Sequence, residues 1–209
     1  MRFSMNKYAI FKRTFDLILS LFGLILISPI MVSIAIAIKL DSRGPIFFKQ
    51  KRFGKNKILF YIYKFRTMKI NAPNDRPTHL LVNPETYITK IGRILRKTSL
   101  DELPQLINIV KGEMSIIGPR PALWNQENLM MERDKYGVNQ ITPGLTGWAQ
   151  INGRDELPIE IKAKLDGEYL SKMSFKFDVL IFLRTIKSVL ISDGVVEGNT
   201  FNKKDINGG

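Results

Sequence analysis

Two adjacent carboxylates, Asp101 and Glu102, are the strongest candidates for chemistry in this sequence. A carboxylate can attack phosphorus, and a pair of carboxylates can bind Mg²⁺, which prefers oxygen ligands and brings substrate phosphates with it. The same residue types also occur where helices begin. Ser99 with Glu102 fits a capping box, and Asp101 could itself be an N-cap with Pro104 in the first helical turn. For an isolated pair of this kind, capping is the simpler interpretation.

Basic residues elsewhere in the sequence favour the chemical interpretation. Lys64, Arg66, Arg96 and Arg120 stand in segments that are typical of strand ends and turns. Their charges could hold and neutralise phosphate oxygens around the acidic pair. Two prolines bracket Arg120 and fix its backbone, which limits the entropy lost when the guanidinium binds a phosphate. A rigid turn that carries a solvated arginine is the alternative.

A glycine-rich motif extends from Thr142 to Arg154. Its repeated glycines allow backbone to approach closely to other backbone or to a ligand. Trp148, inside this motif, could stack on a base or on lipid, or it could be a core residue.

Composition and charge limit the classes of function. The 209 residues include no cysteine and a single histidine, which excludes a thiolate nucleophile and argues against Cys-rich or His-rich metal centres. Thirty-two Lys and Arg residues against 19 Asp and Glu residues give a formal net charge of +13. Such a charge attracts phosphate groups, whether they belong to nucleic acid, anionic lipid or a soluble substrate. The length suits one domain.

An uncharged apolar run from Leu17 to Ile38 is long enough for a helix that crosses a bilayer. Ser28 and Pro29 stand near its midpoint, and an internal proline kinks or breaks a helix. Basic residues flank both ends of the run, and positive charge marks the cytoplasmic side. The segment could therefore enter one leaflet and return, with the Ser28 hydroxyl bonded to free backbone, or it could be a proline-kinked span. A cleavable signal peptide is disfavoured because no small-residue cleavage site follows.

Short elements are expected after the apolar run. Apolar and aromatic pieces at 46–48 and 58–63 predict a β-hairpin with its turn at 54–56. Helical spacing predicts two helices at 88–95 and 103–110. Further segments predict a loop at 71–83, a short buried strand at 116–119, two amphipathic helices after Leu157 with the second over 175–190, and a polar tail from Gly194. The second amphipathic helix could lie on a membrane surface or pack in a core.

Three ordered motifs resemble those of the monotopic phosphoglycosyl transferases, the bacterial sugar transferase family that begins glycan assembly on undecaprenyl phosphate. The motifs are KFRTM at 64–68, SLDELPQLINIVKGEMSIIGPRP at 99–121 and PGLTGWAQINGR at 143–154. The resemblance covers nearly the whole chain, and long ordered motifs are more specific than a short pattern. Ser28 and Pro29 also match the break in this family's re-entrant membrane helix, which favours the hairpin over the span.

The resemblance implies a function for each candidate residue. Asp101 would attack the sugar-proximal phosphate of a UDP-sugar, expel UMP and form a phospho-sugar aspartate. Glu102 would assist as a base or an orienting carboxylate when undecaprenyl phosphate attacks, and Mg²⁺ would bind at Asp101 and Glu102. The phosphate- and nucleotide-binding positions would be Lys64, Arg66, Arg96 and Arg120.

The expected fold is α/β but mostly helical. It consists of a re-entrant helix-break-helix over 1–40, a catalytic domain over 41–195 with a short β-hairpin and interfacial amphipathic helices, and a polar tail over 196–209. The resemblance places the protein on the cytoplasmic face of the bacterial inner membrane, in one leaflet. Nucleic acid is not expected as a partner, and a homo-oligomer is left open.

Two alternative functions remain. A basic membrane-anchored adaptor that binds anions without catalysis would explain the charge and the apolar run, but not the ordered motifs. A hydrolase of polyprenyl or sugar phosphates could use the same acidic pair with water as the acceptor.

Overall fold

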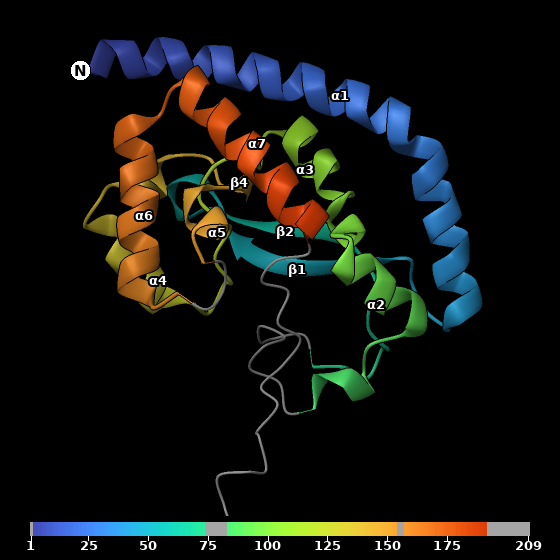
Figure 1. The fold of residues 1–209 in the computed structure, drawn as a ribbon. Coiled ribbons are helices and arrows are strands. Elements are labelled where there is room, and N and C mark those ends of the chain that lie inside the picture. Colours follow the sequence, from blue (N-terminus) through green and yellow to red (C-terminus); the bar gives the residue numbers. More distant parts are fainter. Residues whose placement is uncertain (1, 74–82, 154–156, 192–209) are drawn as a thin grey trace, which may run out of the picture.

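The structure is a computed structural model that describes residues 2–73, 83–153 and 157–191. In this part of the chain helices predominate, and the strands form two sheets of two strands each (Figure 1). The expected mostly helical α/β fold is therefore confirmed. The predicted tail at 196–209 lies outside the described residues, as does most of the predicted loop at 71–83.

One long helix, α1 (Arg2–Asp41), contains the whole apolar run and arches over the rest of the protein (Figure 1). By length and composition it is long and apolar enough to cross a membrane, with a mean hydropathy of 2.6 in its apolar part. Its outer side exposes large apolar side chains, among them Ile10, Phe22, Ile25 and Leu40.

Helix α1 continues through Pro29, so the expected break is instead a curve within one continuous helix. Proline has no N–H to offer to the carbonyl of Ile25, four residues earlier. The Ser28 hydroxyl donates to that carbonyl at 2.8 Å, which confirms the predicted role of this side chain. The Ser33 hydroxyl donates to the Pro29 carbonyl at 2.9 Å. Side-chain donors therefore satisfy backbone acceptors around the proline, and the helix curves without ending.

The predicted β-hairpin is confirmed. Strands β1 (Phe47–Phe53) and β2 (Leu59–Phe65) are antiparallel, and the register pairs Phe47 with Phe65. The turn between them holds Asn56 in the left-handed region at φ 55°, which asparagine tolerates better than most residues.

Two short helices flank the acidic pair, close to where the sequence predicts them. Helix α2 (Lys90–Lys97) begins after Thr89, whose side chain accepts a hydrogen bond from the N–H of Gly92 at 3.0 Å. Helix α3 (Gln105–Lys111) begins after Pro104. Both helices start slightly later than predicted, because a capping side chain and a proline set their first residues.

A second small sheet follows. Strand β3 (Ser115–Ile117) pairs in parallel with β4 (Gly144–Thr146). The strand predicted at 116–119 is confirmed in its first part, and the chain turns after Ile117. Helix α4 (Glu127–Asp134) lies between these strands in the sequence, and the short helix α5 (Trp148–Ile151) follows β4.

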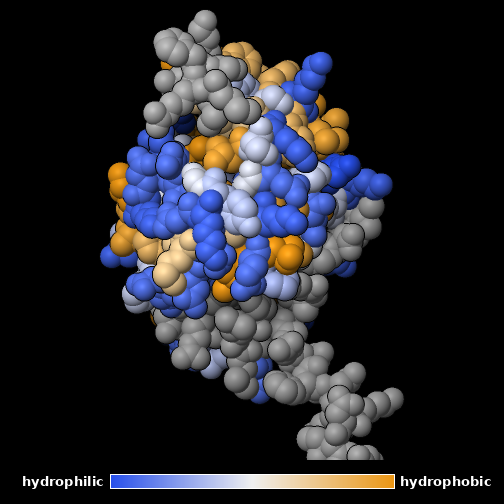
Figure 2. Space-filling model, turned by 90° about the vertical axis from the view of Figure 1, so that its left-hand side faces the viewer, coloured by the Kyte–Doolittle hydropathy of each residue, from blue (hydrophilic) through white to orange (hydrophobic). Residues whose placement is uncertain are grey.

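The two helices predicted after Leu157 are α6 (Ile159–Lys172) and α7 (Phe175–Ile191). Helix α7 buries Ile181 fully in the core, whereas Leu183 is 58% exposed. The helix therefore packs in the core and also presents apolar residues outward. The side of the molecule formed by α4 and α6 is mainly hydrophilic (Figure 2).

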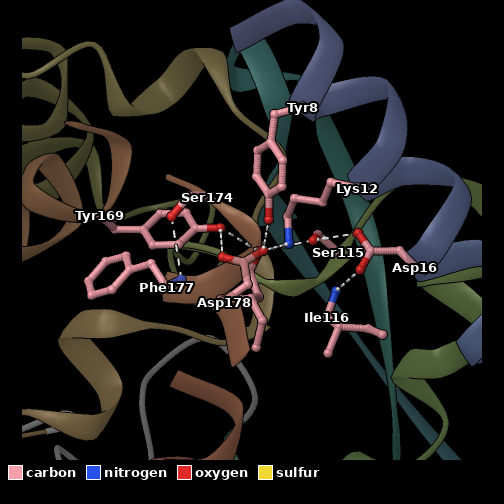
Figure 3. Close-up of polar contacts among 10 residues, drawn as sticks. Tyr8, Lys12, Asp16, Ser115, Ile116, Tyr169, Ser174, Phe177 and Asp178 are labelled. Atoms are coloured by element: carbon pink, nitrogen blue, oxygen red, sulfur yellow. Dashed lines mark hydrogen bonds and ion pairs between the residues drawn. The ribbon is translucent and has the colours of Figure 1, made fainter. Parts of the chain in front are cut away.

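The N-terminal half of α1 is bound to the domain by polar contacts (Figure 3). The carboxylate of Asp178, on α7, accepts hydrogen bonds from Tyr8 at 2.8 Å and from Lys12 at 2.5 Å. Asp16 accepts a hydrogen bond from the hydroxyl of Ser115, on β3, at 2.6 Å. Asp16 and Asp178 are both buried. Removing this half of α1 would take two donors from the buried carboxylate of Asp178 and leave it with the Tyr169 hydroxyl at 2.9 Å, and the loss of partners is costly for a buried charge.

The C-terminal half of α1 is part of the hydrophobic core. Ile34 and Ile38 pack against Phe65 of β2 and Leu95 of α2. Both halves of the helix are thus attached to the same domain.

Candidate active site

Asp101 and Glu102 lie in a 3₁₀ turn, Leu100–Glu102, between α2 and α3. Ser99, just before it, has a left-handed backbone with φ 56°, which is uncommon for a residue other than glycine and is enriched at functional sites. Ser99, the N-cap of this turn, makes no side-chain capping hydrogen bond, and the N-cap of α3 is Pro104 instead of Asp101. Both capping interpretations of the acidic pair are therefore wrong.

Lys64 contacts both carboxylates from the end of β2. It follows the alternation that buries Phe60 and Ile62, so its side chain points to the same side of the strand. Its Nζ lies 2.5 Å from Oε1 of Glu102 and 3.9 Å from Oδ2 of Asp101. The three side chains are 16%, 20% and 14% exposed, respectively. A lysine held this close in a partly buried place can neutralise charge that develops at the acidic pair.

Arg120 is the second cation bound to the pair. Its Nη2 donates to Oε1 of Glu102 at 3.1 Å. The residue lies in the turn after β3, between Pro119 and Pro121, and its side chain is 31% exposed. A solvated arginine on a rigid turn, the alternative from the sequence, does not describe this arrangement.

The two glycine-containing motifs meet at this turn. A Cβ added at Gly118 would lie 2.9 Å from the nitrogen of Gly144, and one added at Gly147 would lie 2.0 Å from the oxygen of Gly118. Side chains are excluded at such distances. The N–H of Gly118 donates to the carbonyl of Thr146 at 2.8 Å. The motifs at 99–121 and 143–154 are therefore parts of one site.

A cavity of about 1260 Å³ brings the predicted residues together. Both carboxylates line it, together with Lys64, Arg96 and Arg120. Arg96 stands in the last turn of α2. Pockets for single drug-sized ligands are commonly about 300–1000 Å³, so this cavity has room for a large ligand or for parts of two ligands.

Arg66 lines the same cavity, but its guanidinium binds the end of α1 instead of the acidic pair. It donates to the carbonyls of Ser42 at 2.7 Å and Arg43 at 2.5 Å, and to the Ser42 hydroxyl at 3.0 Å. The residue is 5% exposed. Arg66 thus satisfies backbone acceptors just beyond α1, and the structure does not place its donors at the carboxylates that Lys64 and Arg120 contact.

The two carboxyl groups have opposite pKa shifts. Burial raises the pKa of Asp101 to about 6, against the lowering effect of Lys64 and with a further raising effect of Glu102. Burial also opposes ionisation of Glu102, but Lys64 and Arg120 outweigh it and hold the pKa of Glu102 well below its ordinary value. Near neutral pH both carboxyl groups are therefore ionised. The surroundings stabilise the ionised form of Asp101 weakly and that of Glu102 strongly.

Asp101 and Glu102 are the two adjacent carboxylates of this cavity that could bind Mg²⁺. The described residues contain no group of three or more His, Cys, Asp or Glu side chains that could hold a metal ion. Mg²⁺ can bind through one or two carboxylates together with substrate phosphates and water. Lys64 and Arg120 occupy one oxygen of Glu102, whereas Asp101 lies 3.9 Å from Lys64, beyond hydrogen-bond distance. The pair fits Mg²⁺ only when phosphate oxygens complete its ligands.

Trp148 is a packing residue. Its ring lies 5.0 Å from that of Phe177, between ring centroids, and the guanidinium of Arg184 lies over it at 5.5 Å. Its indole N–H donates to Glu168 at 3.2 Å. Trp148 is partly buried and packs against a core cluster, which confirms the core interpretation in part.

Sequence reasoning missed two charged residues in the cavity wall, Arg133 of α4 and Asp166 of α6. They form an ion pair at 2.6 Å and are 4% and 1% exposed. They stand far apart in the sequence and outside the three motifs. Charged residues on amphipathic helices ordinarily face solvent, so no local pattern distinguishes these two.

The fold and the cavity define the class of protein: an enzyme whose partly buried acidic pair faces cations suited to phosphate. A model of the family described as bacterial sugar transferase matches residues 7–192. The chain is 42% identical over 190 residues to the uncharacterized sugar transferase EpsL of Bacillus subtilis (strain 168), which covers 91% of this chain and 92% of that protein. The chain belongs to the bacterial sugar transferase family, and it is a sugar transferase.

Two further relatives have more specific names. The chain is 41% identical over 182 residues to a UDP-glucose:undecaprenyl-phosphate glucose-1-phosphate transferase of Escherichia coli (strain K12), covering 84% of this chain and 39% of that protein. It is 37% identical over 195 residues to a UDP-N-acetylgalactosamine-undecaprenyl-phosphate N-acetylgalactosaminephosphotransferase of Aeromonas hydrophila, covering 90% and 45%. This chain therefore spans less than half the length of these two relatives.

Proposed function

We propose that this protein transfers a sugar 1-phosphate from a UDP-sugar to undecaprenyl phosphate and releases UMP. The observation that carries the proposal is Asp101, a partly buried carboxylate with a raised pKa beside the cations of one large cavity. The names of the relatives from Escherichia coli and Aeromonas hydrophila specify a UDP-sugar donor and an undecaprenyl phosphate acceptor. They support these substrate classes for the present chain, although the two names differ in the sugar.

In the first step, a carboxylate oxygen of Asp101 attacks the phosphorus that carries the sugar. The bond from this phosphorus to the oxygen it shares with UMP breaks, and UMP leaves with the electron pair. An acyl phosphate then joins Asp101 to the sugar phosphate. Lys64 and Arg120 offset the negative charge on the phosphate oxygens during the transfer, because they already lie within 3.9 Å of the pair.

In the second step, an oxygen of undecaprenyl phosphate attacks the same phosphorus. The bond to Asp101 breaks, and Asp101 leaves as a carboxylate. Glu102 is a poor base for this step, because Lys64 and Arg120 keep its pKa low. We assign Glu102 the role of an orienting carboxylate that fixes these two cations at the transferring phosphate.

Mg²⁺, held by Asp101 and Glu102 together with the substrate phosphates, would neutralise diphosphate charge when bound. Arg96 lines the same cavity and favours the ionised form of Asp101. Its position supports the proposed role in binding the nucleotide sugar.

The attachment of α1 supports a re-entrant placement in one leaflet of the inner membrane. Tyr8 and Lys12 bind Asp178 near the start of the helix, and Ile38 is buried in the domain core near its end. A helix attached to one domain at both ends cannot place those ends on opposite sides of a bilayer. Its exposed apolar side can then enter the leaflet, while the basic flanks favour the cytoplasmic face.

A turnover assay tests the proposed reaction. The full chain, in detergent or nanodiscs with Mg²⁺ and undecaprenyl phosphate, is given a panel of UDP-sugars, and UMP release and lipid-linked products are measured. We expect UMP with at least one UDP-sugar and an equal amount of lipid-linked sugar diphosphate. An anion-binding adaptor would release no UMP, and a hydrolase would form sugar phosphate without a lipid-linked product.

Trapping tests the covalent step. With a UDP-sugar labelled in the sugar and no lipid acceptor, we expect label on the protein, with UMP released in equal amount. Asp101→Asn should take up no label. Label on Asp101→Asn, or turnover of the wild type without labelled protein, would contradict a phospho-sugar aspartate.

A further inference from the structure

Donors from other segments of the chain hold the turn that carries Arg120 in place. Pro119 and Pro121 have no N–H groups, so the turn has few donors with which to stabilise its own conformation. Its carbonyls are bound by neighbouring segments instead. The N–H of Gly144 donates to the Pro119 carbonyl at 2.9 Å, and the N–H of Phe53 donates to the Ala122 carbonyl at 2.9 Å.

Arginine side chains hold the two carbonyls in between. Nη2 of Arg133 donates to the carbonyl of Arg120 at 3.0 Å. Nη1 of Arg52 donates to the carbonyl of Pro121 at 3.0 Å. Four consecutive carbonyls of the turn are thus bound, two by backbone and two by guanidinium groups.

Arg133 is itself fixed by Asp166. Its Nε and Nη2 donate to Oδ2 of Asp166 at 2.9 and 2.6 Å. Both residues are almost fully buried and line the cavity of the acidic pair. A guanidinium held in this way has a fixed direction, because its donors form a planar, rigid array.

We propose that Arg133, oriented by Asp166, is a positioning residue for Arg120 in the transfer reaction; this inference rests on the proposed function. Nη2 of Arg133 fixes the backbone of the residue whose own Nη2 binds Glu102 at 3.1 Å. A small displacement of a phosphate-binding group is costly, since about 1 Å can lower a rate by about 100-fold. The buried pair therefore sets the place from which Arg120 contacts the phosphate.

A purely structural role, in which the ion pair links α4 to α6, would account for the bonds between Arg133 and Asp166. It would not account for the bond from Arg133 to the Arg120 carbonyl. Ala163 on α6 and Leu129 and Met130 on α4 already pack these helices together. Arg133 adds a bond to the carbonyl of Arg120 and lies in the cavity wall. Its geometry is that of a support for the Arg120 turn.

A double-mutant cycle separates the two interpretations. Arg133→Lys keeps the charge opposite Asp166 but cannot reproduce the planar set of bonds to Asp166 and to the Arg120 carbonyl. We expect kcat/KM for the active UDP-sugar to fall by about 100-fold in the wild-type background. In an Arg120→Lys background, which has already lost the guanidinium that is being positioned, Arg133→Lys should cost less than about threefold, because the two residues act as one unit.

A second variant covers the case in which Arg133→Lys does not fold. Arg133→Met combined with Asp166→Leu removes both charges of the buried pair, an exchange that is often neutral or stabilising. We expect this variant to keep the wild-type unfolding temperature within a few degrees and still lose about 100-fold in kcat/KM. Arg13→Lys is the matched control. Arg13 also donates to two backbone carbonyls, those of Ile109 and Val110, but away from Arg120, and its loss should change kcat/KM by less than threefold.

The outcomes are distinct. Equal losses from Arg133→Lys in both backgrounds, or wild-type kcat/KM in the doubly neutral variant, would overturn the positioning role while leaving the proposed reaction intact. A wild-type protein that releases no UMP from any UDP-sugar would overturn the proposed function and this inference with it.

Discussion

At the scale of single residues, two neighbouring carboxylates have different chemistry because they contact the same cations unequally. Lys64 and Arg120 both bind Oε1 of Glu102, whereas Asp101 lies farther from Lys64. Glu102 is consequently held as an ion, and Asp101 keeps a raised pKa. The sequence indicates the pair and its cations, but which carboxylate Lys64 binds depends on how β2 meets the turn before α3. The assignment of roles therefore needs the structure.

Asp101→Asn should abolish turnover, because an amide is a very poor nucleophile toward phosphorus. The fold and the membrane location should be retained. Glu102→Gln should also reduce kcat severely, since Lys64 and Arg120 would lose their shared charged partner. UMP release measures both effects. Asp101→Asn with activity within about tenfold of the wild type, a barrier change of only about 1.4 kcal/mol, would refute the nucleophile assignment.

Stability should depend on pH through Asp101. Its pKa of about 6 in the folded protein exceeds the ordinary 3.8, so the folded state binds the proton more tightly than the unfolded state does. Stability therefore falls as pH rises from about 4 to about 6, and above this range the ionised carboxylate costs on the order of 3 kcal/mol. We expect Asp101→Asn to unfold at a higher temperature than the wild type at pH 8, and at a similar temperature at pH 4. Thermal unfolding in EDTA measures this.

Glu102→Gln is the matched control, with the opposite sign. The pKa of Glu102 is lowered in the folded protein, so its ionised form stabilises the fold above its ordinary pKa and this stability is lost as pH falls. Glu102→Gln should therefore be less stable than the wild type at pH 8. If both variants shifted the unfolding temperature in the same direction at pH 8, the opposite pKa shifts that we assign to Asp101 and Glu102 would be wrong.

At the scale of elements, short sequence patterns predicted the helices and strands that form from residues close together in the chain. Apolar and aromatic pieces on either side of a turn located the β-hairpin, and helical spacing located α2 and α3. Contacts between distant segments were not predictable. Arg66 stands in a motif beside Lys64, and nothing nearby in the sequence shows that the end of α1 lies against it. The same limit applies to Arg133, whose bond to the Arg120 carbonyl depends on how α4 packs.

Arg66→Lys distinguishes a helix-end contact from a phosphate ligand. Lysine lacks the planar fork that binds the Ser42 and Arg43 carbonyls and the Ser42 hydroxyl together, so partly buried acceptors lose donors. We expect a loss of about 2–3 kcal/mol, or roughly 5–10 °C in unfolding temperature. The KM of the folded fraction for the UDP-sugar should stay within about threefold of the wild type, a barrier change of under about 0.7 kcal/mol.

Arg93→Lys is the control for this comparison, because Arg93 is an exposed arginine paired with Glu85 on the surface. It should change neither the unfolding temperature nor KM, since exposed pairs contribute little. An unchanged unfolding temperature together with a large rise in KM for Arg66→Lys would restore Arg66 as a phosphate ligand.

At the scale of the whole molecule, α1 is a helix long and apolar enough to cross a membrane, and contacts near both of its ends attach it to the rest of the protein. The sequence placed both of its ends on one side through their basic flanks. The contacts of Lys12 with Asp178 and of Ile38 with the core support this prediction independently, because they attach both halves of α1 to the same domain. The sequence also predicted a break at Pro29, but the Ser28 hydroxyl replaces the missing donor and the helix continues.

Topology can be measured directly, because the chain has no native cysteine. A cysteine at Ser4 and one at the exposed Asn71 should both react with impermeant reagents only after cells are opened. Labelling of the Ser4 position in intact spheroplasts, with the Asn71 position protected, would show that α1 crosses the bilayer.

Pro29→Ala tests what keeps α1 from becoming a straight span. The alanine restores the N–H for Ile25, so the run from Leu17 to Ile38 can straighten to about 33 Å, enough to cross the hydrocarbon core. Detaching the N-terminal half costs the contacts of Asp178, so we expect part of the Ser4-position cysteines to become labelled from outside, with a matching loss of turnover.

Asp178→Leu added to Pro29→Ala should increase the outside-labelled fraction, because leucine offers Tyr8 and Lys12 no acceptor, and the domain keeps no unpaired carboxylate at this position once the helix half detaches. Ile30→Ala, an exposed neighbour in the same helix, is the control and should change neither topology nor turnover. If Pro29→Ala leaves both unchanged but the combined variant moves the N-terminus outward, the polar contacts of Asp178 rather than the proline hold the helix in one leaflet. If neither variant moves it, the packing of the C-terminal half of α1 against the core is sufficient, and the proposed role of Pro29 in topology is wrong.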